Sequence, residues 1–235
     1  TSTHSFRNPS LKQLMRWGSD RAIIEADIGD AARELSIKLV IEPEKKSYYV
    51  HGKRKSNKEI KSILPSIIFT PDDLLLIKGS NSIKRAALDA VGTQISLHYK
   101  TVKKDYEKIL HHKNNLLKEN YSMLYLESLN EPFIKIASQL YCYRSALFEK
   151  AKPFIQRYYQ EMTGNDEDID VSYIPSWIDD DSENPHQYNF TKEEVTENIT
   201  SSLEKKKDEE RKRRYSLIGP HNDKMEFYIN GKNAR

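Results

Sequence analysis

The chain has 235 residues, with 38 Lys and Arg against 35 Asp and Glu and a net charge of +3 at pH 7. It contains no run of about 18 apolar residues and no basic-then-apolar leader, which argues against a membrane-spanning helix and a signal peptide. A single cysteine, Cys142, cannot form an internal disulfide, so we expect a reducing, cytoplasmic compartment. The charge is too balanced to indicate nucleic acid by itself, so that partner would need local clusters of cations.

The first 65 residues are predicted to be rich in strands. Residues 21–27, 35–41 and 47–51 have β-branched or alternating patterns, and a turn at residues 42–46 separates the last two. They predict an antiparallel meander with one face toward a core. Residues 66–70 are short, apolar and bounded by prolines, which predicts a buried strand. Thr70 then fits the N-cap of a helix that starts at Pro71.

From about residue 81 the pattern predicts helix. Asn81 or Ser82 is the expected N-cap of a helix through Leu88. Two series of side chains follow at alternating steps of four and three residues, typical of a helix pair. The first is Ile95, Tyr99, Val102, Tyr106, Ile109, Lys113 and Leu116, and the second is Phe133, Ala137, Leu140, Arg144, Leu147, Ala151, Phe154 and Tyr158. With a turn near residues 120–131, they predict an antiparallel helical hairpin.

The C-terminal part is predicted to return to strands. Residues 163–190 are acidic and turn-rich, apart from a candidate strand at 171–174. Thr191 and Glu194 form a capping-box pattern that opens a charged helix reaching Arg214. Residues 217–221 have strand character, and residues 225–229 predict a strand before a tight turn at 230–231. No partner strand follows that turn, so we expect the chain to be a piece of a longer protein.

Local motifs give little indication of catalysis. The phosphate-binding patterns GxxxxGK[ST] and GxGxxG are both absent, and residues 78–80 are interpreted as a turn between two helices. No His or Cys spacing fits a metal site, and no GxSxG elbow is present. The remaining candidates are basic clusters at residues 51–55, 84–85, 100–118 and 211–214. They either contact phosphates or form charge-paired solvated surfaces.

Several segments, in order along the chain, resemble RecF, a family of recombination-repair ATPases in the SMC/Rad50-like ABC class. Residues 67–80 with the basic pair Lys84 and Arg85 are similar to the family's apolar strand, P-E/D-D-L segment, K/R-G-S/G turn and basic pair. Residues 215–224 resemble its L-x-G-P-H-R-D-D strand, although Asn222 replaces the Arg and Lys224 the second Asp. Residues 5–7 resemble the S-x-R after the family's Walker A helix, and residues 51–53 and 113–118 give weaker matches.

The resemblance implies an α+β fold, in which the antiparallel β portion of an ABC-type ATPase head carries an inserted long helical-hairpin arm. Residues 1–90 would belong to the head, 91–214 to the arm, and 215–235 to a strand returning to the head. Walker A would lie upstream of residue 1, and the signature motif and Walker B downstream of residue 235. The full-length protein would bind ATP and Mg²⁺ as a weak DNA-stimulated ATPase, whereas this fragment is expected to bind neither and to hydrolyse no ATP.

The family's role implies DNA replication, repair and recombination in the response to DNA damage, including the SOS response. The protein would bind DNA at single-strand gaps and single-strand/duplex junctions under the control of ATP, as a homodimer, and load recombinase with RecO and RecR. The implied phosphate contacts are Arg7, Lys78, Lys84, Arg85, Arg211, Arg213 and Arg214. His221 and Asp223 would lie near the nucleotide or on the dimer face.

Reversing the charges of Lys84 and Arg85 together is expected to weaken DNA binding without unfolding the protein. The alternative from another functional class is a structural arm and dimerisation module of an SMC/Rad50-like protein, without direct DNA contact.

Overall fold

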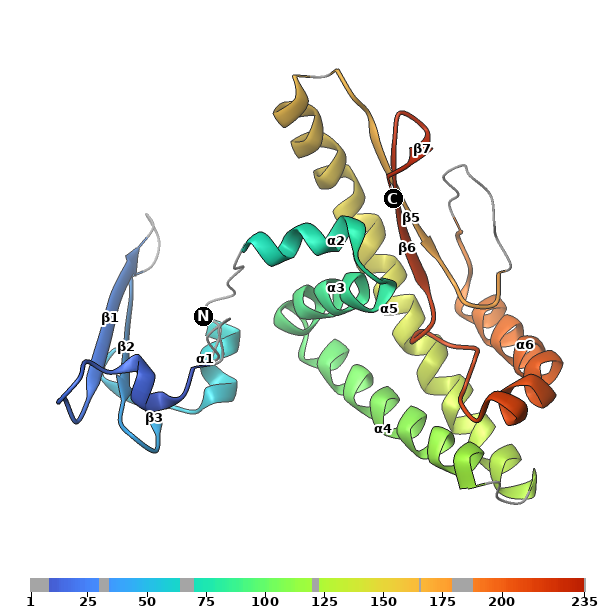
Figure 1. The fold of residues 1–235 in the computed structure, drawn as a ribbon, viewed down its shortest axis with the longest axis horizontal. Helices are drawn as coiled ribbons and strands as arrows, with labels where there is room; N and C mark the ends of the chain where they lie inside the picture. Colours follow the sequence, from blue (N-terminus) through green and yellow to red (C-terminus); the bar gives the residue numbers. More distant parts are fainter. Residues whose placement is uncertain are drawn as a thin grey trace. The chain divides into compact units, whose positions relative to one another are not determined.

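The structure is a computed structural model that describes residues 9–29, 34–63, 70–119, 123–164, 166–178 and 188–234. It mixes helices with antiparallel sheets, which confirms the expected fold class, and it divides into two compact units, Thr1–Phe69 and Thr70–Arg235 (Figure 1). Arg7 and the strand predicted at residues 66–70, except Thr70 itself, lie outside the described residues. The head and arm boundaries at residues 90 and 214 stay a prediction. None of the described helices is long and apolar enough to cross a membrane.

The first unit contains the predicted antiparallel meander, with one strand more than expected. Its strands β1 (Ala22–Gly29), β2 (Glu34–Ile41), β3 (Lys46–Val50) and β4 (Lys53–Lys55) lie in sequence order. His51 and Gly52 both have positive φ, 46° and 73°, as a two-residue hairpin turn between β3 and β4 requires. A short helix α1 (Asn57–Ile63) buries Ile60 against Tyr48 and Val50, so one face of the sheet meets a core. A 3₁₀ turn, η1 (Leu11–Leu14), precedes the sheet.

The second unit begins with three short-to-medium helical segments. They are η2 (Pro71–Leu74), α2 (Leu75–Lys78) and α3 (Asn81–Ile95). The N–H and hydroxyl of Thr70 both donate to Asp73 Oδ2, at 2.5 and 3.0 Å, which confirms the predicted start at Pro71. The predicted turn at residues 78–80 does separate two helices, but the N-cap of α3 is Ser80, not Asn81 or Ser82. The helix also continues to Ile95, beyond the predicted end at Leu88.

The predicted helical hairpin is present. Its helices α4 (Leu97–Glu119) and α5 (Met123–Thr163) run antiparallel and pack together (Figure 1). Alternating steps of three and four residues mark their contact, and Phe133, Ala137 and Leu140 are each fully buried. The turn is shorter than expected, because α5 starts at Met123. The buried series is shorter too, since Ile95 at one end and Phe154 and Tyr158 at the other are exposed.

The rest of the unit packs a three-stranded sheet and one helix against α5. The sheet has the order β5 (Ile169–Ile174), β6 (Lys224–Ile229), β7 (Lys232–Asn233), and α6 (Lys192–Arg213) opens with the predicted Thr191–Glu194 capping box. The strand at residues 225–229 and its turn are confirmed, and β5 and the short β7 are its partners. The expectation that no partner strand follows the turn is wrong, because β7 follows it directly and pairs with β6. Residues 217–221 form turns, not the predicted strand, because Gly219 has a φ of +135° and Pro220 follows it.

Candidate functional site

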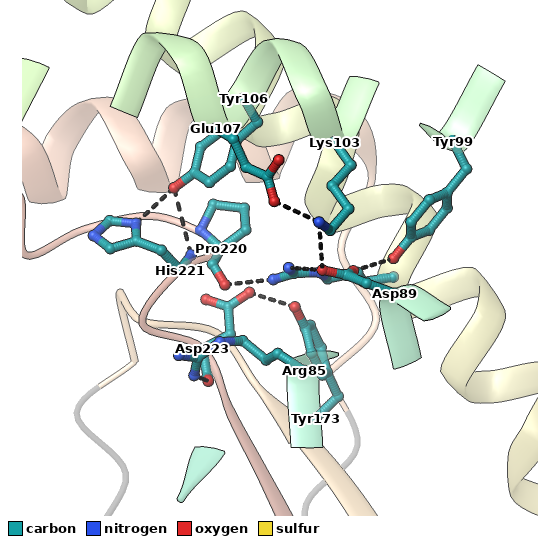
Figure 2. Close-up of polar contacts among 11 residues, drawn as sticks. Arg85, Asp89, Tyr99, Lys103, Tyr106, Glu107, Tyr173, Pro220, His221 and Asp223 are labelled. Atoms are coloured by element: carbon teal, nitrogen blue, oxygen red, sulfur yellow. Dashed lines mark hydrogen bonds and ion pairs between the residues drawn. The ribbon is translucent and has the colours of Figure 1, made fainter. Parts of the chain in front are cut away.

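A buried polar network joins α3, α4, α5 and β5 to the turn that precedes β6 (Figure 2). The turn contains the sequence Gly219 to Asp223, one of the segments on which the family resemblance rests. The network brings together residues more than 100 positions apart in the chain, such as Tyr106 and His221. The network therefore marks the region where the Gly219–Asp223 turn meets α3, α4, α5 and β5.

Arg144 of α5 and Asp89 of α3 form the centre of the network. Arg144 Nε donates to Asp89 Oδ1 at 2.9 Å and Nη2 donates to Oδ2 at 2.8 Å, a bidentate pair in which both residues are 5% exposed. The third guanidinium nitrogen, Nη1, donates to the carbonyl of Pro220. The hydroxyl of Tyr99 adds a hydrogen bond to Asp89 at 2.5 Å. One arginine thus holds two helices and the turn together.

Asp223 is fully buried beneath this pair. Its carboxylate accepts a hydrogen bond from the Tyr173 hydroxyl at 2.5 Å and another from the Ser176 N–H at 2.8 Å. Burial raises the pKa of Asp223, and these two donors together with the Arg144 charge oppose the rise. The side chain fixes the turn against β5. It presents no carboxylate at the surface of this unit to a nucleotide or another subunit.

His221 lies between α4 and its own turn. Its Nε2 is 2.9 Å from the carbonyl of Ser216, which can only accept, so Nε2 carries the proton. The Tyr106 hydroxyl therefore donates to Nδ1, at 2.6 Å. Burial lowers the pKa of His221 to about 4, and the imidazole is neutral at pH 7. Both ring nitrogens are occupied, which leaves the ring no proton site for catalysis.

The basic pair that was predicted to contact DNA points inward. Lys84 is 4% exposed, its ammonium donates to the carbonyl of Met225 at 2.9 Å, and it lies 5.2 Å from the ring centroid of Phe227. Arg85 is half-buried and donates to the carbonyl of Asp223. Both side chains therefore attach α3 to β6 and its preceding turn. The burial of Lys84 argues against the expectation that reversing both charges leaves the fold intact, because a carboxylate there would face the Met225 carbonyl in a nearly buried place.

An open depression of about 470 Å³ lies beside the network, between α3 and α4. Its charged lining is mixed, with Arg85, Lys103 and Arg144 against Asp89 and Glu107. Burial and repulsion from Arg144 lower the pKa of Arg85. Lys103 is held by Glu107 and lies 4.0 Å from Asp89. The lining offers polar contacts but no activated nucleophile, and no metal-binding group of His, Cys, Asp or Glu occurs among the described residues.

The other predicted DNA contacts lie on separate elements. Lys78 is exposed at the end of α2. Arg211, Arg213 and Arg214 are exposed at the end of α6, where Arg213 pairs with Glu209 at 2.8 Å. These cations are accessible to an anion, unlike Lys84, while Arg7 is outside the described residues. The structure does not gather the predicted contacts into one site.

Sequence reasoning missed the two central residues of the network. Arg144 occupies a core position of the predicted helix pair, where a charged side chain needs a buried partner. That was the available signal, but Asp89 is 55 positions away and nothing local identifies it as the partner. Lys113 is a second such case, since it forms a 2.8 Å ion pair with Glu210 of α6 and both are buried.

Comparison with known proteins extends the resemblance over nearly the whole chain. No family model matches. Proteins named DNA replication and repair protein RecF are similar over 98–99% of the chain, with 29% identity in Lactobacillus johnsonii and 27% in both Lactobacillus gasseri and Geobacter sp. strain M21. The resemblance to RecF is confirmed. The chain spans about 62% of the length of the RecF proteins from the two Lactobacillus species.

Two solved structures share the fold. They are described as the recombination mediator protein RecF in the RecFOR pathway, one as RecF-ATP and one as RecF-ATPrS. Each superposes with a TM-score of 0.75 over 99% of this chain and 62% of the solved chain, at 23% identity. The chain thus shares the fold of these two RecF structures, and in this chain the Gly219–Asp223 turn is held to α3, α4, α5 and β5 by the buried network.

Proposed function

We propose that the chain is part of a RecF-like DNA replication and repair protein, in which it carries the helical arm and part of the head and takes part in ATP-controlled DNA binding. The observation that carries this proposal is the similarity to RecF over 99% of the chain, from the first unit through the Gly219–Asp223 turn. The partners implied are DNA at gaps and junctions, RecO and RecR, and a second copy of the protein when ATP is bound.

The exposed cations support DNA binding by charge. Lys78 and the arginines at the end of α6 are open to solvent and can neutralise phosphates. The buried network fixes α3, α4 and α5 around one turn and so holds the body of the unit that carries these elements. Since this chain lacks GxxxxGK[ST], the proposed control by ATP and Mg²⁺ would come from the longer protein.

Binding of labelled DNA by the 235-residue chain tests the proposal. We expect binding of duplex with a single-strand gap that weakens steeply with salt, because phosphate contacts release counterions. The longer protein should bind the same DNA more tightly with ATP and Mg²⁺ than without them. Absence of salt-dependent binding in both proteins would contradict the proposed function.

One observation favours the second candidate function, a dimerisation module. Phe154, Tyr158 and Met162 recur every four residues on α5 and are 55%, 51% and 78% exposed, which places an apolar row on one face of the helix. Sedimentation velocity of the 235-residue chain over a range of concentrations separates the two functions. Self-association without DNA binding would favour the dimerisation module. DNA binding by a monomer would favour the RecF-like function.

A further inference from the structure

The outer face of α4 carries four exposed lysines that have little or no counter-charge among the described residues. Lys100, Lys104 and Lys118 are exposed and make no ion pair with any described residue, while Lys108 has only a 3.8 Å contact with Asp105. The two lysines nearer the core differ, since Lys103 is held by Glu107 and Lys113 by Glu210. We call Lys100, Lys104, Lys108 and Lys118 the lysine row.

Helix geometry places the lysine row opposite the packed face of α4. The buried residues of this helix, such as Tyr99, Val102 and Tyr106, face the rest of the unit. A step of four residues advances about 6 Å along a helix and returns to the same face, so Lys100, Lys104 and Lys108 point together into solvent. Lys118 extends the same face to a length of about 27 Å. In Figure 1, α4 lies along one edge of the second unit, with α5 beside it.

The end of α6 carries two further cations close to α4. The N–H of Ser216 donates to Asn114 Oδ1 of α4 at 2.8 Å, which holds the end of α6 against the second half of α4. Arg213 and Arg214 precede this contact by two or three residues and are exposed. These two arginines are thus exposed near α4, although Arg213 is paired with Glu209, so the inference rests on the lysine row alone.

The lysine row lacks the apolar centre that protein interfaces use. None of the described residues from 98 to 119 is an exposed large hydrophobic side chain; Leu97, at 71% exposed, lies at one end. Stable protein partners bind around buried aromatic or aliphatic anchors. A line of cations without such anchors instead matches a polyanion, and DNA presents one phosphate about every 3.4 Å along each strand.

We propose that the lysine row on α4 is a docking surface for the DNA backbone. This inference rests on the proposed function and adds the place where the nucleic acid lies. Lysines contact phosphates as point charges, so the surface positions the protein on DNA without reading base sequence.

Neutralising the row tests the proposal on the 235-residue chain. The variant Lys100→Gln/Lys104→Gln/Lys108→Gln keeps helix propensity, and all three positions are exposed, so its far-UV circular dichroism and Tm should match wild type. The control Lys135→Gln/Lys150→Gln/Lys205→Gln removes the same charge from exposed positions on α5 and α6. Fluorescence anisotropy with a labelled gapped duplex, over a series of salt concentrations, gives the affinity and its salt slope.

We expect the row variant to bind at least about tenfold more weakly at 100 mM salt and to lose about 2 to 3 from the slope of log K against log salt. The control should stay within about threefold of wild type. Equal losses in both variants, or full affinity in the row variant, would overturn the α4 surface and leave the proposed function standing. If the wild-type chain binds polyglutamate but no DNA, both the α4 surface for DNA and the proposed function are overturned, and an acidic protein is indicated as the partner.

Discussion

Arg144 of α5 contacts Asp89 of α3 through two hydrogen bonds, and the same guanidinium holds the carbonyl of Pro220. The pair lies 55 positions apart in the sequence and excludes nearly all solvent, with both residues 5% exposed. Charges that are buried this deeply are tolerated only when every hydrogen-bonding group is satisfied. The pair therefore fixes which helices surround the Gly219–Asp223 turn.

Replacing Arg144 by Met is expected to destabilise the second unit by about 3 to 5 kcal/mol, because the buried Asp89 would keep only the Tyr99 hydroxyl and the Pro220 carbonyl would lose the Arg144 donor. Urea unfolding followed by circular dichroism measures the change. The matched control is Arg157→Met on the same helix, where the side chain is 59% exposed and the change should stay within about 0.5 kcal/mol. A cost below about 1 kcal/mol at Arg144 would contradict this account of the network.

The buried pair of Lys113 and Glu210 should behave as a coupled unit. Removing the ammonium with Lys113→Met leaves Glu210 buried and charged, at a cost of about 3 kcal/mol. Glu210 also accepts hydrogen bonds from the Ser216 hydroxyl and the Leu217 N–H, at 2.9 and 2.7 Å, and a glutamine can still accept them. The double variant Lys113→Met/Glu210→Gln should thus recover most of the lost stability. A double-mutant cycle in urea measures this coupling, and additive losses would disprove it.

Acid should destabilise the protein through His221. Its pKa is lowered to about 4 in the fold and is about 6.5 when unfolded, so the unfolded state binds the extra proton between these values. Stability from this group is complete above pH 6.5 and is lost as the pH falls toward 4, by up to about 3 kcal/mol. The groups acting on the ring include Lys113 and Arg85, which lower its pKa further, and Glu210, which raises it.

The variant His221→Gln isolates this contribution, since its amide can still donate to the Ser216 carbonyl while carrying no titratable proton. Unfolding free energies at pH 4.5 and 7.5 should differ by about 2 kcal/mol less in the variant than in wild type. Asp223 contributes the opposite sign, because its raised pKa favours the folded state in acid, and it is unchanged in both proteins. Equal pH dependence in the two proteins would show that His221 titrates normally.

Replacing Gly92 of α3 by alanine is expected to destabilise the protein. A Cβ there would lie 2.6 Å from the ring of Tyr99, which is buried and hydrogen-bonded to Asp89. Helix propensity alone predicts that Gly92→Ala stabilises by about 1 kcal/mol, whereas overpacking costs about 1 to 3 kcal/mol. We expect the net change in urea to be destabilising. The comparison is Ala90→Gly at an exposed position of the same helix, where propensity alone should act, and a stabilised Gly92→Ala would show that Tyr99 moves freely.

Sequence patterns predicted the elements better than the partners of their polar residues. The Thr191 capping box, the strand at residues 225–229 and the helix pair follow from local spacing, which the chain displays within a few turns or strands. The inward direction of Lys84 depends on the Met225 carbonyl, 141 positions away, and local charge spacing cannot encode it. The strand predicted at residues 217–221 failed for a local reason, because its β-like residues surround a glycine whose φ suits only a turn.

The helix α5 has 41 residues, and the contact between Arg144 and Asp89 fixes it near its middle. Arg144 stands 21 residues from one end of the helix and 19 from the other. A helix of this length measures about 61 Å, so Arg144 divides it into two halves of nearly equal length. A rigid tilt of α5 by 5° about Arg144 would move the two ends of the helix by about 2.5 to 3 Å in opposite directions. A displacement of the hairpin tip reaches the end beside β5 in full only while α5 stays straight, and Pro132 and Pro153 stand inside it, one on each side of Arg144.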